Sequence, residues 1–261
     1  MSLEAQPNET GPDAQGQGAP LPSPRADNAG PASPSVFDGP LLTERVRGEV
    51  NALLVSAELL LEDFDALPTN EMWQRMAAMN RHAFSVHHLV ENLLCAANIE
   101  EGRFRIYKKT VELEDLIAAI QPVVAPLLAQ KGQRLEVVTP STAPLSLDPR
   151  RICQALVNLI VNASAFSGND YSIEIRLVFR GAGVRIAVLD RGLIASGPGG
   201  RSLAYPTLSE ATALGAESEI ALSLAVVKAI VEAHGGTVGA NARRNGGARY
   251  WFHLPWTSPD P

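Results

Sequence analysis

The stretch DPRRICQALVNLIVNASAFS, residues 148–167, decides the fold of this chain. Asp148 followed by Pro149 predicts the start of a helix, because aspartate caps free backbone N–H groups and proline suits the first helical position. Four apolar residues then recur at steps of four, three and four, which predicts one buried helix face: Ile152, Leu156, Leu159 and Ala163.

Two asparagines, Asn158 and Asn162, stand one helical turn apart on a neighbouring face of this helix. Uncharged amides at this spacing are typical either of a solvated surface or of a helix that lines a polar pocket. In the second case, an amide oxygen can bind a hard cation such as Mg²⁺. The helix alone leaves both interpretations open.

The composition favours a folded, acidic protein. Hydrophobic residues make up 46% of the 261 residues, which is enough for a sizeable core, and the net charge of −6 argues against nucleic-acid binding. No apolar run approaches 18 residues and the N-terminus does not resemble a leader, so we expect no membrane span and a cytoplasmic location. Cys95 and Cys153 lie in apolar helical patterns, which predicts buried thiols rather than a disulfide or a metal pair.

The chain divides into three predicted parts. Residues 1–37 are rich in Pro, Gly, Ala and Gln, which predicts a disordered tail. Residues 38–102 carry two heptad patterns separated by a break at Pro68, which predicts a helical hairpin. A single hairpin leaves its apolar stripe in water, so we expect two copies to form a four-helix bundle as a homodimer. The predicted contacts to the second copy are Val50, Leu53, Ala57, Leu60, Val86, Val90 and Leu93.

Residues 103–257 alternate helix and strand and predict a helix-on-sheet layer, so that the whole chain belongs to the α+β class. Strands are expected over 104–107, 134–139, 171–180, 184–190, 237–242 and 248–254. Helices are expected over 111–131, 148–167 and 219–234.

The order of these parts resembles the core of bacterial sensor histidine kinases, with a dimerisation hairpin and a GHKL-type (Bergerat) α/β sandwich. The motif DPRRICQALVNLIVNASAF is similar to the family's N box, and LAVVKAIVEAHGGTV is similar to the helix after its second glycine box. The resemblance implies that Asn162 binds Mg²⁺ and that Asn158 lines an ATP site. It also implies that Asp190 accepts the adenine amino group, beside Gly192 and an ATP lid over about 192–218.

The phosphoacceptor motif of the family departs from its pattern in this chain. Counting back from SAELLLED, the histidine position falls on Glu44, and the position four residues later is Gly48. A carboxylate has no imidazole nitrogen to form a phosphoramidate, and glycine cannot position an attacking water. We therefore expect no catalytic residue here.

The glycine boxes of the family also depart from their pattern. In the first box the last glycine is Ile194, and in the second all three glycines are replaced, by Glu219, Ala221 and Ser223. Such glycines let backbone N–H groups approach phosphates at a helix start, and a carboxylate there repels them. Asn158, Asn162, Asp190 and Gly192 would then be vestigial. No cofactor is expected, with ATP and Mg²⁺ binding only if the altered pocket is still competent.

Three hypotheses follow from this pattern. The first is a silent, kinase-like adaptor that binds a response regulator or another signalling protein. The second is an active kinase or phosphotransferase that uses a histidine of the second helix, and the third is a small-molecule sensor. A partner surface is predicted at Glu44, Arg45, Arg47 and Glu49, with less certain contributions from His87 and His88, which are expected to be partly exposed.

Overall fold

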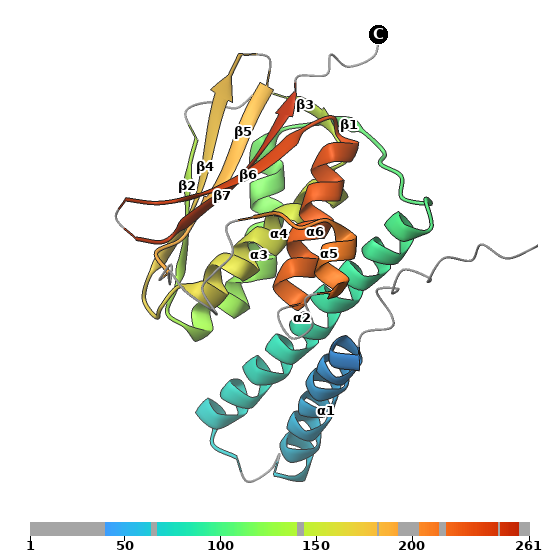
Figure 1. Ribbon diagram of the computed structural model, residues 1–261. Helices are drawn as coiled ribbons and strands as arrows, with labels where there is room; N and C mark the ends of the chain where they lie inside the picture. Colours follow the sequence, from blue (N-terminus) through green and yellow to red (C-terminus); the bar gives the residue numbers. More distant parts are fainter. Residues whose placement is uncertain are drawn as a thin grey trace, which may run out of the picture. The chain divides into compact units, whose positions relative to one another are not determined.

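The computed structural model describes residues 40–63, 67–139, 144–181, 183–192, 204–213, 218–244 and 246–255. The predicted tail, Ile194 and most of the predicted lid lie outside these residues, as does the side chain of Arg45. The two helices of the predicted hairpin are α1 (Pro40–Glu62) and α2 (Thr69–Glu100), which pack against each other (Figure 1).

A five-stranded sheet forms the centre of the following part, in the order β2-β4-β5-β7-β6. The strands are β2 (Arg134–Val138), β4 (Ser172–Arg180), β5 (Gly183–Leu189), β6 (Thr237–Ala242) and β7 (Ala248–Pro255). β2 runs parallel to β4, and the remaining neighbours are antiparallel. Each of these strands was predicted from its alternating pattern, to within a residue or two at the ends.

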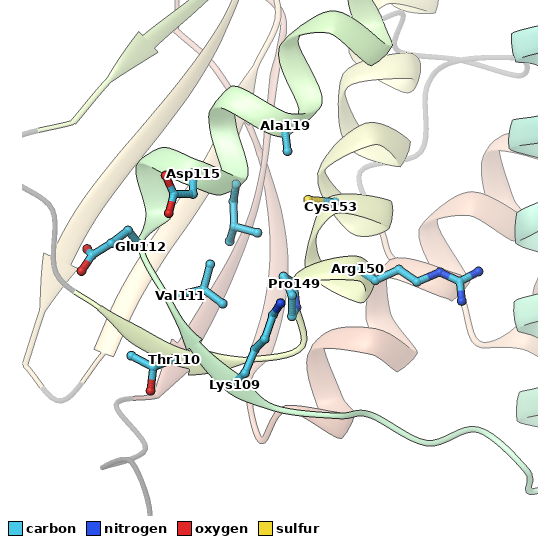
Figure 2. A pocket seen from close by; sticks show the side chains of 10 residues that line it. Lys109, Thr110, Val111, Glu112, Asp115, Ala119, Pro149, Arg150 and Cys153 are labelled. Atoms are coloured by element: carbon cyan, nitrogen blue, oxygen red, sulfur yellow. The ribbon is translucent and has the colours of Figure 1, made fainter.

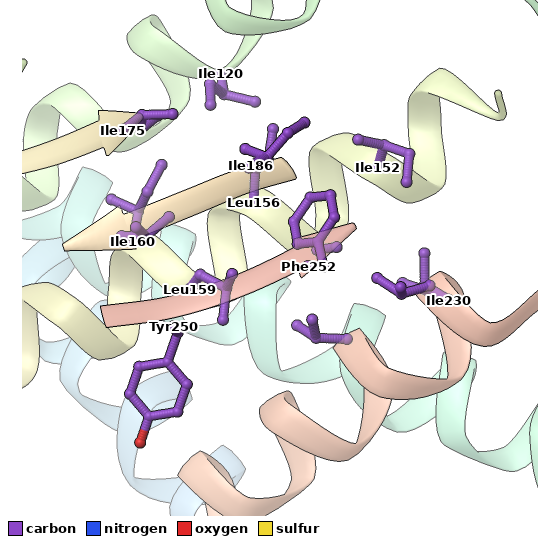
Figure 3. Packing of buried hydrophobic residues seen from close by; sticks show 14 of the residues in the cluster. Ile120, Ile152, Leu156, Leu159, Ile160, Ile175, Ile186, Ile230, Tyr250 and Phe252 are labelled. Carbon is purple, nitrogen blue, oxygen red and sulfur yellow. The ribbon is translucent and has the colours of Figure 1, made fainter. Parts of the chain in front are cut away.

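Three helices cover one face of this sheet: α3 (Leu113–Gln130), α4 (Pro149–Phe166) and α6 (Ser218–Ala233) (Figure 1). Their apolar faces meet the inward side chains of β5 and β7, where Ile186 lies opposite Phe252 in the strand register. Figure 3 shows α4 contributing Ile152, Leu156 and Leu159 to this core. The apolar stripe predicted for residues 148–167 is therefore the centre of the fold.

A second, two-stranded sheet pairs β1 (Lys109–Val111) with β3 (Leu145–Leu147). The strand predicted over 104–107 is wrong, because its polar groups bond to other partners. The Arg105 guanidinium donates to the carbonyls of Gly102 and Phe104, and the Tyr107 N–H donates to the Asp148 carboxylate at 2.8 Å. The short helix α5 (Leu208–Ala213) was not predicted either.

The elements from β1 to β7 form one unit, which we call the α/β unit, and the C-terminal half of α2 belongs to its core. Leu89, Cys95 and Ala96 are at most 1% exposed and join the main apolar cluster. The boundary placed at residue 102 from the sequence stays a prediction, and α2 has one half outside this core and one half within it.

α3 is the one described helix that is long and apolar enough to cross a membrane by length and composition, with a mean hydropathy of 1.3. The helix includes Glu114 and Asp115, so it is not an unbroken apolar run. Three of its residues, Leu116, Ile120 and Val124, are buried in the core of the α/β unit. Core helices of soluble proteins pass the same test.

Candidate functional site

The start of α4 is held by a hydrogen-bonded junction. The Asp148 carboxylate accepts the N–H of Arg151 at 3.1 Å, which confirms the predicted cap. The Asp148 N–H donates to His234 Nε2 at 2.9 Å, so His234 Nδ1 carries the proton and donates to the Ile230 carbonyl at 2.7 Å. This junction joins the end of α6 to the start of α4 and fixes the two helices that line the site.

Asn158 is completely buried in the middle of α4, so the interpretation as a surface residue is wrong. Its Nδ2 donates to Asn92 Oδ1 at 2.9 Å and to the Ser223 carbonyl at 3.2 Å. Its Oδ1 accepts from Asn92 Nδ2 at 3.0 Å and contacts His88 Nε2 at 2.6 Å. A primary amide has two donor hydrogens and two acceptor lone pairs. All four are used by protein groups.

His88 differs from its prediction, since only 7% of it is exposed. Because Asn158 Oδ1 can only accept, His88 Nε2 must carry a proton and donate to it. The ring also stacks on Phe84, with the centroids 5.9 Å apart. Burial lowers the pKa of His88 below its ordinary value of 6.5, an effect opposed by the hydrogen bond to Asn158. His88 is thus a buried, neutral donor, whereas its neighbour His87 is exposed as expected.

Asn162 lies one turn further along α4 and is 4% exposed. Its Nδ2 donates to the Ser223 hydroxyl at 2.8 Å, and that hydroxyl donates to the Ile220 carbonyl at 2.9 Å. Within the described residues, its Oδ1 has no hydrogen-bond partner. Unlike Asn158 Oδ1, this oxygen can bind a hard cation without displacing a donor of the described residues.

Two of the residues that replace the family's glycines lie near Asn162: Ser223 bonds to it, and Glu219 lines the same cavity. α6 begins at Ser218, so Glu219 lies in its first turn and Ser223 follows one turn later. Glu219, Ser223 and Asn162 line one cavity of about 350 Å³, together with residues of α2 and α3. A carboxylate at a helix start is favoured by the helix dipole and disfavours a phosphate at the same place.

Asp190 and Gly192 make contacts that stabilise the α/β unit. Asp190 is buried, and its Oδ1 accepts the N–H groups of Gly192 at 2.9 Å and Ala248 at 3.0 Å. A Cβ on Gly192 would lie 2.3 Å from the Phe166 carbonyl oxygen at the end of α4. Both residues of the predicted adenine-binding motif therefore hold the end of β5 to its neighbours.

The described part of the predicted lid packs onto this region. The Tyr205 ring meets Tyr250 edge to face, with the centroids 5.6 Å apart, and Ala211 of α5 packs against Ala221 and Ala225 of α6. Burial raises the pKa of the Tyr205 hydroxyl far above its ordinary range, and that hydroxyl has no partner among the described residues. Tyr205 thus packs against Tyr250 of β7, and the N–H of Ala248 in the same strand donates to Asp190.

The predicted partner surface on α1 is divided. Glu44 and Arg47 are exposed and form an ion pair with each other at 2.8 Å. Glu49 turns toward α2 and contacts His82 Nδ1 at 2.9 Å. Gly48 has no atom within 4 Å of an added Cβ, so no packing constraint requires a glycine there.

A second cavity, of about 490 Å³, lies between β1, the start of α3 and the start of α4 (Figure 2). Glu112 and Asp115 border it on one side and Cys153 on another, while Arg150 extends away from them. Cys153 is half-buried rather than buried as predicted, and burial raises the pKa of its thiol, as it does for Cys95. A thiol of raised pKa is a poor nucleophile, so we assign no chemistry to this cavity.

Comparison with known proteins agrees with this architecture. Residues 147–258 match the family described as "Histidine kinase-, DNA gyrase B-, and HSP90-like ATPase". The Escherichia coli K12 sensor protein KdpD is 28% identical over 220 residues, covering 84% of this chain and 24% of KdpD. The Escherichia coli O157:H7 sensor histidine kinase ZraS is 32% identical over 159 residues, covering 59% of this chain and 33% of ZraS.

This chain has the core of a sensor histidine kinase with a GHKL-type ATPase domain. Acinetobacter baumannii histidine kinase AdeS shares the fold, with a TM-score of 0.54 at 18% identity over 82% of this chain and 98% of the AdeS chain. The kinase core spans about a quarter of the length of the KdpD proteins that it matches. The matched family and the similarity to KdpD over most of this chain relate it to two-component histidine kinases.

The structure brings together residues of the kinase core that the sequence left apart. Asn92 and Ser223 are central to the site, yet neither was predicted to contact an asparagine. The family motif pointed to Ser223 only as a lost glycine, and no signal marked Asn92 within LVENLL. Among the described residues, no group of three or more histidine, cysteine or acidic side chains is arranged to hold a metal.

Proposed function

We propose that this kinase core is a catalytically silent, dimeric signalling adaptor of the two-component type. The observation that carries the proposal is the occupation of Asn158, whose four hydrogen-bonding positions are all used by Asn92, His88 and Ser223. Mg²⁺–ATP does not fit this arrangement, since binding at Asn158 would leave buried donors and acceptors unpaired. Glu219 adds a negative charge where phosphates would lie.

Calorimetry with ATP and Mg²⁺ tests the loss of nucleotide binding. We expect no dissociation constant in the low micromolar range or below, since Asn162 and Asp190 alone support at most weak binding. Incubation with ATP labelled at the γ-phosphate should leave the protein unlabelled, because Glu44 offers no phosphoacceptor nitrogen. Tight binding or stoichiometric labelling would establish an active kinase instead.

Exposed apolar residues of the hairpin support dimerisation. A stripe on α2 recurs at steps of three and four and is exposed throughout: Trp73, Met76, Asn80, Ala83, His87, Val90 and Leu94. Leu54 and Leu61 form a matching exposed pair on α1, and Trp73 is 65% exposed. Apolar side chains at heptad spacing favour burial against a second hairpin.

This surface differs from the predicted one. Leu53 and Leu60 are half-buried on α1, which packs on α2 within one chain, whereas Val90 is exposed as a contact to a second copy requires. We therefore expect Leu53→Asp to disrupt the hairpin itself, because a buried unpaired carboxylate is strongly unfavourable. Leu54→Asp should yield folded monomers in analytical ultracentrifugation at micromolar concentration. A monomeric wild-type chain would refute dimerisation.

A receiver domain is the partner class that this proposal favours, docking near Glu44 and Arg47 on α1. Both side chains are exposed and charged, and charges at an interface rim chiefly set association rate and specificity. The reversal Arg45→Glu with Arg47→Glu should weaken capture of a response regulator from native lysate, while Arg180→Glu on the exposed end of β4 should not. Equal capture by both variants would place the interface elsewhere.

The cavity of about 350 Å³ beside Asn162 favours a second candidate function, the small-molecule sensor. Its volume falls within the range of ligand sites, and its wall includes Arg81, which has no ion pair or hydrogen bond with the residues that the structure describes. Native mass spectrometry of the purified chain should reveal a bound small molecule if this function is correct. Mass spectra of the bare protein, with no ligand gained from a metabolite extract, would exclude it.

A further inference from the structure

The polar contacts between α2 and α4 join two parts of the chain that are far apart in sequence. His88 and Asn92 on α2 meet Asn158 on α4, across separations of 70 and 66 residues. All three side chains are buried, with exposures of 7%, 1% and 0%. Burying a polar group without a partner costs free energy. The contact is therefore favourable only when all three side chains are positioned to bond to one another.

We infer that Asn158 fixes the orientation of α2 on the α/β unit, so that His88 and Asn92 form a polar latch that holds the hairpin in one arrangement relative to that unit. The latch rests on the proposed function in one respect, because it uses the amide that a bound nucleotide would otherwise need. Asn92 and Asn158 exchange two amide hydrogen bonds, at 2.9 and 3.0 Å, and such a reciprocal pair forms in one relative orientation.

Residues around the latch add further contacts between α2 and α4. Gln154 of α4 donates to the Glu91 carbonyl at 3.3 Å, and the exposed Arg150 pairs with Glu91 at 3.1 Å. His88 and Asn92 are one turn apart on α2, so they lie on one face of that helix. A rotation of α2 about its axis would therefore move both side chains away from Asn158 together, and it would also displace Leu89 and Cys95, which are buried in the same core.

Distance measurements between spin labels test the latch without any nucleotide. Labels are placed at Gln74→Cys on the outer half of α2 and at Glu232→Cys on α6, both exposed positions, in a full-length Cys153→Ala chain. Labelled chains are diluted into unlabelled ones, so that distances within one chain dominate. We expect a single narrow distribution for the otherwise native chain.

His88→Ala and Asn92→Ala should each broaden this distribution or add a second population. His87→Ala, at the exposed neighbouring position, should leave it narrow, and His88→Gln should partly restore it, because a glutamine amide can donate to Asn158 Oδ1. If an alanine variant does not fold, Asn92→Ser is used, which removes the amide with a smaller change in volume. Distributions that stay narrow in the latch variants, or one that is already broad in the native chain, would overturn the latch.

The latch and the proposed function can fail separately. Broad distributions in a chain that still binds no nucleotide would refute the latch alone, since Glu219 and the lost glycines would account for weak binding. Low-micromolar ATP binding by a chain with a narrow distribution would refute the silent adaptor and leave the docking contact standing.

Discussion

α4 and α6 line the same cavity, yet they depart from the sensor kinase pattern to different degrees. α4 keeps both asparagines of the resembled N box, whereas α6 carries Glu219, Ala221 and Ser223 where the family has glycines. The serine on α6 changes the partner of one asparagine, because the Ser223 hydroxyl accepts from Asn162, whereas Asn158 donates to the Ser223 backbone carbonyl, which any residue supplies. A motif that keeps its residues therefore indicates the family's function only where the residues that face it in the structure are kept as well.

Asn158→Leu gives the largest expected effect and tests whether the kept asparagine is structural. The change leaves His88, the Asn92 amide and the Ser223 carbonyl without partners in a buried site. Each unsatisfied group costs about 1–3 kcal/mol, so the free energy of unfolding should fall by roughly 3 kcal/mol or more. Urea denaturation measures it, with the exposed Asn169→Leu as the matched control, expected within about 0.5 kcal/mol of the wild type. If Asn158→Leu leaves the free energy of unfolding unchanged, the structural role is refuted and a ligand-binding role is favoured.

Gly192→Ala tests whether the glycine that is kept in the first glycine box is required for packing. The added Cβ would lie 2.3 Å from the Phe166 carbonyl oxygen, so the end of α4 must move. Overpacking of this kind lowers the free energy of unfolding by about 1–3 kcal/mol. Gly48→Ala on α1 is the control, since nothing lies within 4 Å of its Cβ, and it should stabilise the helix by roughly 0.5–1 kcal/mol. Unchanged stability of Gly192→Ala would mean that the glycine is not required for packing.

Acidification should weaken the two histidine contacts that hold α4 in place, that of His88 with Asn158 and that of His234 with Asp148. Burial lowers the pKa of His88 and of His234 below the ordinary 6.5. The unfolded chain then takes up protons that the folded chain does not, so stability is full above pH 6.5 and falls as the pH is lowered through it. Urea midpoints at pH 7.5 and 5.5 should show this loss, and His88→Gln should reduce it. A midpoint that rises toward pH 5.5 would contradict the neutral, donating His88.

Glu44→His gives the smallest expected effect. It tests whether the changes on α6 are enough to prevent phosphorylation when a histidine is present at position 44. The exchange restores a phosphoacceptor type on an exposed part of α1, but it changes nothing at Glu219 or Ser223. Labelled ATP should therefore leave Glu44→His unmodified, as it leaves the wild type. Phosphate incorporated at position 44 would show that the altered α6 still presents ATP for transfer.

The amino-acid sequence by itself determined most of the architecture. Periodicity placed α2, α4 and the five strands of the main sheet, because apolar spacing follows directly from helix and strand geometry. Local chemistry fixed the cap at Asp148, since donor and acceptor are three residues apart. The order of the elements and two motifs were enough to indicate the sensor kinase family. The strand predicted over 104–107 failed because its alternation does not reveal that Asp148, far along the chain, binds Tyr107.

Only the tertiary structure decided what the site residues do. A hydrogen bond between His88 and Asn158 joins residues 70 positions apart, and no local pattern encodes such a pairing. Heptad spacing showed that α2 has apolar faces, but it could not separate the face on α1 from the exposed stripe that includes Trp73 and Leu94. Asn158 is ambiguous in sequence because an amide suits water, a cation or another amide equally well. Packing resolved the ambiguity by burying it against Asn92 and Ser223.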